Sequence, residues 1–213
     1  MPAVTASVPM ATAAALLNDT AQNFFTSAYL LPFAQQAHNE LQAKMRLAAA
    51  PVMIGNYTQE VLANATSLTG PTDIVEPLRI FAKNHGADAS TYQELTEVAP
   101  TGIFPSIYVD PQLTLNYWMW FEEAVLFVAA TTAQDILMIY KRQIATITSG
   151  GSTVGITGGE LYMAPRIAAL ACGAAGEQAR YEALTQIAES FISQVILANK
   201  GRVMPTQGAA DKS

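Results

Sequence analysis

The sequence predicts an α+β protein, mainly α, in which helices from the two ends of the chain form a bundle around a small antiparallel β-insertion. Three observations predict this class. Apolar residues recur at helical spacing near both ends. Glycine and proline interrupt residues 51–148 every few positions, which excludes long helices there. Neither terminal pair of helices covers its apolar stripe alone, so helices distant in sequence are expected to pack together.

Residues 1–50 are predicted to hold two helices. A short helix over residues 9–17 ends at Asn18 and Asp19. A longer helix over residues 26–49 contains Pro32 in its first turns and stops before Pro51. The apolar stripe of the longer helix is formed by Leu30, Phe33, Ala37, Leu41 and Met45. This stripe predicts the face that enters the core.

Residues 51–148 are predicted to form the β-rich insertion, a satellite sheet with its own aromatic patch. A strand over residues 75–81 contains Pro77, and proline cannot donate to a β-ladder. We therefore expect this strand at a sheet edge.

Three further strands are predicted in the insertion. Strands over residues 113–121 and 125–129 flank Glu122 and Glu123, which form a hairpin turn between them. A strand over residues 135–147 alternates apolar and polar residues and has one polar side.

Residues 149–200 are predicted to form a helical pair that packs on the N-terminal helices. The glycine-rich stretch 150–159 is interpreted as a flexible connector. The helix over residues 160–175 is rich in alanine, so another backbone can approach it closely. The final helix ends at Asn199-Lys200-Gly201, a cation and a glycine typical of a helix C-terminus. Residues 201–213 are predicted to be a flexible tail, and the whole chain one domain.

The chain is unusually poor in charge. Of its 213 residues 51% are hydrophobic and 13% are charged, whereas soluble domains average about 25% charged residues. This composition favours a subunit whose flanks are covered by neighbours in an assembly; the alternative is an alanine-rich globular domain. The net charge of −6 argues against electrostatic wrapping of nucleic acid. The apolar stretch 124–130 is far short of the ~20 residues of a membrane span.

No catalytic, cofactor or metal site is predicted from the titratable residues. His38 and His85 have no partner at metal-ligand spacing and are interpreted as surface or boundary histidines. Cys172 lies among small apolar residues and is interpreted as a core residue. Glu122 and Glu123 are adjacent, so in a strand they would point to opposite faces and could not act together.

The aromatic residues 117–121 are the strongest candidate for a partner interface. Strand alternation places Tyr117, Met119 and Phe121 on one side. Trp118 and Trp120 lie on the other, where a partner subunit would cover them. Burial of both sides within the chain is the alternative interpretation.

Six segments, taken in order, carry a family resemblance. They are Ala-Leu-Leu-Asn-Asp at 15–19, Leu-Leu-Pro-Phe leading into Ala-His-Asn-Glu-Leu-Gln at 30–42, Thr-Asp-Ile-Val-Glu-Pro at 72–77, Trp-Met-Trp at 118–120, the Tyr-Lys-Arg strand at 135–143, and Arg-Ile-Ala-Ala-Leu-Ala-Cys at 166–172. Over about residues 9–200 this order resembles the head-to-tail connector (adaptor, or neck) proteins of tailed bacteriophages. The chain departs from the family at its C-terminus, which is short and mostly neutral.

The resemblance implies a structural virion protein without catalysis, located at the neck where capsid and tail meet. Such proteins form a ring, typically dodecameric, below the portal protein. The ring extends the DNA channel, which DNA crosses without specific binding, and gives the tail or a tail-completion protein its attachment platform. No cofactor or membrane is implied.

The segment after Asn199 is expected to dock into portal, which adds Lys200, Arg202, Val203 and Met204 to the expected partner interface. Two other functions stay open. The chain could be another virion protein, for tail completion or capsid decoration. Less favoured is a cell-wall hydrolase of the neck, which would need an acidic pair across a cleft.

Overall fold

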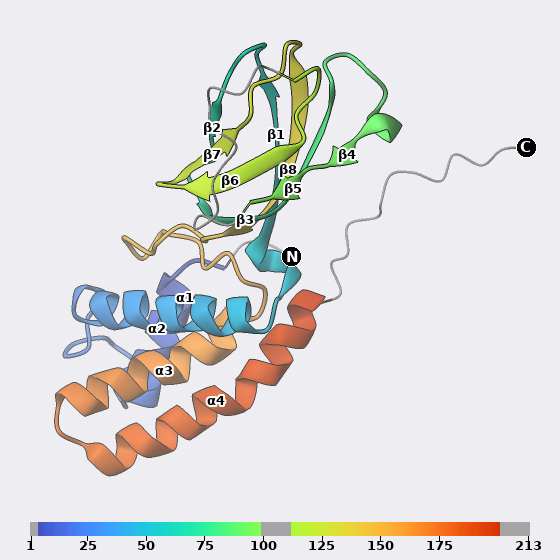
Figure 1. Ribbon diagram of the computed structural model, residues 1–213. Helices are drawn as coiled ribbons and strands as arrows, with labels where there is room; N and C mark the ends of the chain where they lie inside the picture. The colour runs from blue at the N-terminus through green and yellow to red at the C-terminus, as the bar shows by residue number, and fades with distance from the viewer. Residues whose placement is uncertain (1–3, 99–111, 201–213) are drawn as a thin grey trace, which may run out of the picture. The chain divides into compact units, whose positions relative to one another are not determined.

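The computed structural model describes residues 4–98 and 112–200, and these group into two units (Figure 1). Among the described residues, 4–53 and 144–200 belong to the helical unit, and 54–98 and 112–143 belong to the β unit. The chain thus leaves the helical unit after Met53 and returns to it at Ile144.

Helices α1 (Ser7–Leu16) and α2 (Ser27–Leu47) open the helical unit. The hydroxyl of Thr26 accepts a hydrogen bond from the Tyr29 amide and so caps α2. Lys44 and Arg46 lie in its last turn, where cations complement the helix dipole. The buried face of α2 carries Leu30, Ala34, Ala37, Leu41 and Met45, and a short 3-10 turn, Pro51–Met53, follows.

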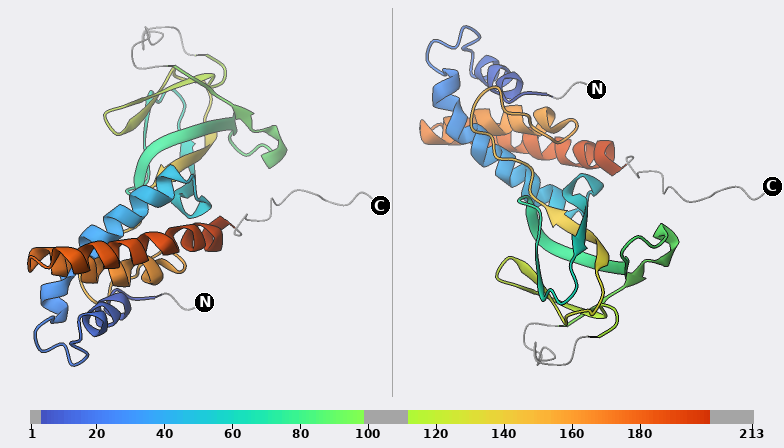
Figure 2. Two further views of the ribbon diagram at one scale, coloured as in Figure 1. Left: turned by 90° about the horizontal axis from the view of Figure 1, so that it is seen from below. Right: turned by 90° about the horizontal axis from the view of Figure 1, so that it is seen from above.

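Helix α3 (Gly159–Ala174) is the centre of the helical unit, and α4 (Gln178–Lys200) packs along it. α3 contacts each of the other three helices, and Figure 2 shows it between α1 and α4. Its close packing depends on small side chains. Ala164, Ala168, Ala169 and Ala171 are all buried, and a Cβ built on Gly173 would lie 3.1 Å from the Tyr181 ring.

Buried polar side chains fix the segment 144–157 to these helices. Gln42 donates to the Ile144 carbonyl (3.1 Å) and accepts from the Ile144 amide (3.0 Å). Asn199 makes the same two bonds to the backbone of Thr157 (2.9 and 3.3 Å). Residues 150–158, predicted as a flexible connector, contain no named helix or strand, and side-chain amides bond the backbone at both ends of the segment 144–157.

The strands of the β unit form two sheets of four strands each in the described residues. One sheet has the order β1-β8-β3-β4 and the other β2-β7-β6-β5. The strands are β1 (Ile54–Val61), β2 (Ser67–Thr69), β3 (Ile74–Asn84), β4 (Gln93–Glu94), β5 (Thr96–Glu97), β6 (Tyr117–Phe121), β7 (Ala124–Phe127) and β8 (Gln134–Arg142). Paired strands are antiparallel except β5 and β6, which are parallel.

One apolar core lies between the two sheets. Trp118 and Phe127 come from the second sheet, and Ile80, Ile136 and Met138 come from the first. Each is at most 2% exposed. Because side chains alternate along β8, Ile136, Met138 and Tyr140 enter this core while the residues between them face outward.

The predicted fold class, mainly α with a small antiparallel β-insertion in a bundle of N- and C-terminal helices, is wrong. The described residues hold four α-helices and two four-stranded sheets with a core of their own. The sequence does not predict the two sheets because β1 is mostly polar along its exposed side. In addition, β2, β4 and β5 have only two or three residues. Strands this short carry no readable alternation.

Two predictions within the insertion concern single positions. β3 lies between β8 and β4 in the strand order, but β4 pairs only with Phe81 and Ala82, so at Pro77 the strand is a local sheet edge, as predicted. A register shift between Pro77 and Arg79 absorbs the missing N–H. The hairpin at Glu122 and Glu123 is confirmed: both residues join β6 to β7 with positive φ, 47° and 63°, as a two-residue type I′ turn requires.

Candidate functional site

The exposed surface of α1, the following loop and the start of α2 carries no exposed charge. Asp19 is the single charged residue between positions 4 and 39, and it is only 8% exposed. Large apolar side chains are nevertheless open to solvent here, namely Val8, Leu16, Phe24 and Tyr29. We call these four residues, with Ala11, Thr12 and Ala15, the N-terminal surface; all are exposed. Depletion of charge with exposed aromatic residues is typical of a protein–protein interface.

The loop between α1 and α2 holds Phe24 outward. The Asp19 carboxylate accepts hydrogen bonds from the amides of Asn23 (3.0 Å), Phe24 (2.8 Å) and Phe25 (2.7 Å). These bonds, led by the one from Phe25, hold the pKa of Asp19 below its usual value. Phe24 itself is 83% exposed. The loop therefore has an ordered backbone that presents an aromatic side chain to solvent.

A second uncharged surface lies on α4. Its outer face is formed by Ala179, Ala183, Gln186, Ile187, Ser190, Ser193, Gln194 and Leu197, all exposed. Of the charged residues of α4, Glu182 and Glu189 flank this face, while Arg180 and Lys200 lie near the two ends of the helix. α4 turns its opposite side, with Leu184, Ala188 and Val195, into the core. Arg180 donates to the Leu16 carbonyl (2.9 Å), so the start of α4 lies against the end of α1.

Several charges of the helical unit are paired within it. Lys44 binds Glu189 (2.9 Å) and Arg180 binds Glu177 (3.3 Å). Arg166 on α3 binds Glu40 on α2 through two nitrogens, at 2.6 and 3.0 Å. Each of these charges has a partner within the unit, and Arg180 also donates to the Leu16 carbonyl at the edge of the N-terminal surface (2.9 Å).

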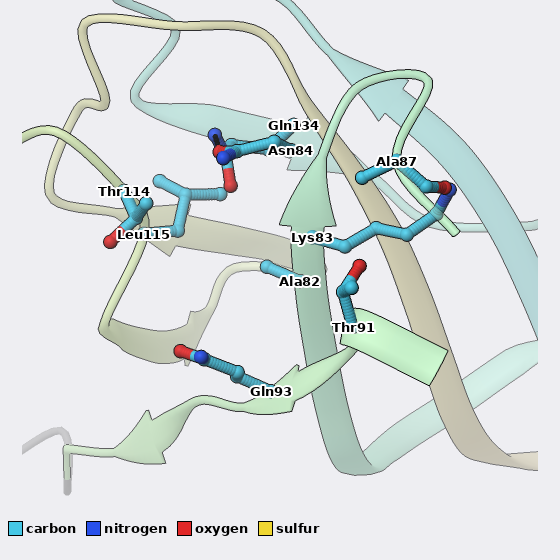
Figure 3. Close-up of a pocket in the computed structure, with 9 residues that line it drawn as sticks. All are labelled: Ala82, Lys83, Asn84, Ala87, Thr91, Gln93, Thr114, Leu115 and Gln134. Carbon is cyan, nitrogen blue, oxygen red and sulfur yellow. Dashed lines mark hydrogen bonds between the residues drawn. The ribbon is translucent and has the colours of Figure 1, made fainter. Parts of the chain in front are cut away.

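A pocket of about 180 Å³ lies in the β unit (Figure 3). Two of the polar side chains in its lining are engaged within the chain. Gln134 donates to Asn84 (2.8 Å) and to Thr132 (3.0 Å). Lys83 donates to the Ala87 carbonyl and lies 3.1 Å from an Asp135 oxygen. Lys83 and Gln134 are therefore held by partners within the chain.

Beside this pocket, two carboxylates face each other across neighbouring strands. Glu60 on β1 is the register partner of Asp135 on β8, and Lys83 on β3 pairs with Asp135 on the other side. His85 contacts both carboxylates, 2.8 Å from Asp135 and 3.8 Å from Glu60. The hydrogen bond to Asp135 and these two negative charges raise the pKa of His85.

His38 has the opposite environment, and its prediction as a surface or boundary residue is wrong. It is fully buried, and its Nε2 donates to the Val154 carbonyl at 2.9 Å. Its Nδ1 accepts from Gln42 at 3.2 Å. Burial lowers the pKa of His38, against the opposing effect of the Val154 bond. The neutral ring is thus a structural link between α2 and the segment 144–157.

We expect the two histidines to titrate on opposite sides of pH 6.5. Protonated His85 is stabilised in the fold, so its contribution is complete below pH 6.5 and is lost as pH rises through its raised pKa. His38 favours the neutral ring, so stability falls as pH drops below 6.5. Because the chain has only two histidines, a ¹³C-edited NMR titration resolves both. His85→Gln assigns the peaks, and equal midpoints for the two rings would contradict the expectation.

The described residues predicted as a partner interface belong to two different units. Trp118 is 2% exposed and fills the β core, and Trp120 is half-buried against that core. Lys200 ends α4, in the helical unit. Arg202, Val203 and Met204 lie outside the described residues. The alternative of burial within the chain is therefore the better account of Trp118.

The remaining titratable candidates occupy structural positions. Glu122 and Glu123 form the β6–β7 turn, and Cys172 is buried in the helical core. Within residues 4–98 and 112–200, no group of three histidine, cysteine or carboxylate side chains is arranged to hold a metal ion. None of the helices in that part of the chain has the length and apolar character needed to cross a bilayer.

Neither the N-terminal surface nor the outer face of α4 was predicted from the sequence. A signal was present in both cases. A run of 36 positions from Val4 to Asn39 with Asp19 as its only charge marks the first. The uncharged residues at helical spacing from Ala179 to Leu197 mark the second. Neither a family model nor a curated protein sequence matches this chain.

Proposed function

We propose that the protein is a head-to-tail connector of a tailed-phage virion, which closes into a ring below the portal protein. The observation that carries this proposal is the presence of two uncharged surfaces, on different helices, on one helical unit. A two-fold dimer needs one self-complementary patch, whereas a ring needs two different patches that meet head to tail. The N-terminal surface and the outer face of α4 supply two such patches.

The partners and the role follow from the family resemblance. The ring binds portal on one side and the tail or a tail-completion protein on the other, and DNA passes through it. A net charge of −6 supports passage without tight binding, because the duplex is itself an anion. In this role the protein is a structural component of the virion neck and performs no catalysis.

The first experiment measures assembly directly. The purified chain, alone and mixed with the portal protein of its phage, is analysed by native mass spectrometry and negative-stain imaging. A ring of one fixed copy number, dodecameric by the resemblance, is the expected result. A protein that stays monomeric and leaves the portal unbound would contradict the proposal. Hundreds of copies per particle would instead identify a decoration protein.

A matched pair of variants tests the surface on α4. Leu197 on α4 and Leu62 in the β unit are both 67% exposed, so a charge at either position leaves the fold intact. Leu197→Glu is expected to weaken self-association about tenfold or more, because it places an unpaired charge in a desolvated contact. Leu62→Glu is expected to assemble like the unmodified chain. Sedimentation velocity measures the self-association of both variants. Equal weakening by the two would show that α4 is not part of the contact.

A further inference from the structure

A row of charged side chains crosses three strands on the outer face of the first sheet. Glu60 on β1, Asp135 on β8 and Lys83 on β3 are register partners in that order. His85 follows β3 directly, and its Nδ1 lies 2.8 Å from an Asp135 oxygen and 3.8 Å from a Glu60 oxygen. We call Glu60, Lys83, His85 and Asp135 the β1–β8 charge cluster.

The turn that carries His85 is fixed to the start of β8 by its backbone. The His85 amide donates to the Ala133 carbonyl (3.0 Å), and the Gly86 amide donates to an Asp135 oxygen (3.4 Å). The same oxygen lies 3.1 Å from the Lys83 ammonium. The backbone therefore places the imidazole beside both carboxylates whatever its charge.

The protonation of His85 decides the charge balance of the cluster. With the imidazolium present, two cations accompany two carboxylates. A neutral ring can still donate from Nδ1 to Asp135, but Glu60 then faces a like charge directly across the strand pair, which destabilises paired strands. Lys83 compensates little for Glu60, because it lies on the far side of Asp135. Among the described residues, the cation that pairs with Glu60 is His85.

The strand that this imbalance affects most is β1. In the described part of the chain, β1 is at the edge of its sheet and pairs with β8 alone. Glu60 and Val61 form its last two pairs, with Asp135 and Gln134. The end of a strand that has a single neighbour opens at a lower free energy than strands inside a sheet.

We propose that protonated His85 holds the last residues of β1 against β8, and that this end of β1 opens more often once the ring has lost its proton. When it opens, the backbone groups of β8 that face it lose their partners. The inference concerns the β unit alone and is independent of the proposed ring.

The direction of the pH dependence follows from the groups that surround His85. The hydrogen bond to Asp135 and the charges of Glu60 and Asp135 raise the pKa of His85, and the charge of Lys83 opposes them. The attachment of β1 is therefore complete just below pH 6.5 and is lost as pH rises through the raised pKa.

Native-state hydrogen exchange of the full chain, followed by NMR, measures this opening. Protection factors are compared, because they remove the base-catalysed pH dependence of exchange itself. Between about pH 5.5 and about pH 8.5 the protection of amides in residues 58–61 should fall by up to about fivefold, the range for one cross-strand charge pair. Residues 54–57, at the other end of β1, should change little. An equal fall at both ends, or none at residues 58–61, would overturn the inference.

Two substitutions identify the groups responsible. Glu60→Gln removes one of the opposed charges, so protection of residues 58–61 should stay high at about pH 8.5. His85→Gln imitates the neutral ring and should give the low protection at every pH. In the double variant, His85→Gln should add nothing to Glu60→Gln. A role of His85 that does not depend on charge would lower protection with or without Glu60, and that result would overturn the inference.

Glu76→Gln is the matched control. Glu76 is an exposed glutamate on the same sheet, and it pairs with Lys141 (2.6 Å), the register partner of Ile54 at the opposite end of β1. The variant should leave the pH dependence at residues 58–61 unchanged. If it abolishes that dependence as Glu60→Gln does, the net charge of the sheet is the cause and the role of His85 is wrong.

Discussion

Trp118→Ala is expected to lower the free energy of unfolding of the β unit by about 3–5 kcal/mol, the range for deleting a large buried aromatic side chain. The indole is 2% exposed and packs in the core shared by both sheets. Its removal leaves a cavity that the short strands around it cannot close. Urea denaturation followed by circular dichroism measures the loss.

Trp120→Ala is the matched control for this prediction. Trp120 is the same residue type on the same strand, but it is only partly buried, so the expected loss is clearly smaller. The experiment also separates the two interpretations of the aromatic run. If Trp118→Ala folds with unchanged stability but fails to bind a partner, Trp118 is an interface residue and its assignment to the core is wrong.

Arg166→Met is expected to lower the free energy of unfolding by about 2–4 kcal/mol, because it leaves a partly buried carboxylate without its cation. Arg166 and Glu40 have side chains 12% and 29% exposed. Arg166 also donates to Thr185 on α4 (3.0 Å), and the Tyr162 hydroxyl donates to Glu40 (3.2 Å). This network joins α2, α3 and α4.

The exposed pair of Arg79 and Glu94 is the control for Arg166. It has the same two-nitrogen geometry, with both contacts at 2.6 Å, but its side chains are 54% and 46% exposed. Arg79→Met should therefore change stability much less than Arg166→Met. Thermal and urea unfolding of both variants measure the difference, and equal losses would show that burial does not decide the effect.

The pH dependence of the Arg166 network has a defined sign. Burial disfavours the ionised form of Glu40, but the hydrogen bonds from Arg166, Gln36 and Tyr162 and the charge of Arg166 outweigh it. The pKa of Glu40 is therefore held below its usual value. A lowered carboxyl pKa contributes stability above the unfolded value of 4.5, and this contribution is lost as pH falls. Glu40→Gln should remove that part of the acid sensitivity.

Local periodicity allowed the helices to be predicted within a few residues. The stripe from Leu30 to Met45 lies on the buried face of α2, and α4 ends at Lys200 as its C-terminal residues indicate. The turn at Glu122 and Glu123 was also predicted, because it separates two apolar strands that are adjacent in sequence.

Features that depend on distant residues were not predictable. β3 pairs with β8 about 60 residues later along the chain, and nothing near Pro77 indicates that partner. His38 is buried where it bonds the Val154 carbonyl, and these two residues are 116 positions apart in the chain. Phe24 is exposed in a loop whose backbone amides donate three hydrogen bonds to the Asp19 carboxylate. A sequence pattern does not show that a phenylalanine in such a loop faces solvent.

The hydrogen bonds from Gln42, His38 and Asn199 to the segment 144–157 have a practical consequence. All three side chains hold main-chain atoms of that segment, so the identity of its outward residues matters little. Thr146, Thr148 and Thr153 are exposed and should accept a fluorophore or an epitope without loss of folding. A dye at one of these positions would report when this segment binds the helices during refolding. Substitution of Gln42, His38 or Asn199 is expected to destabilise the fold.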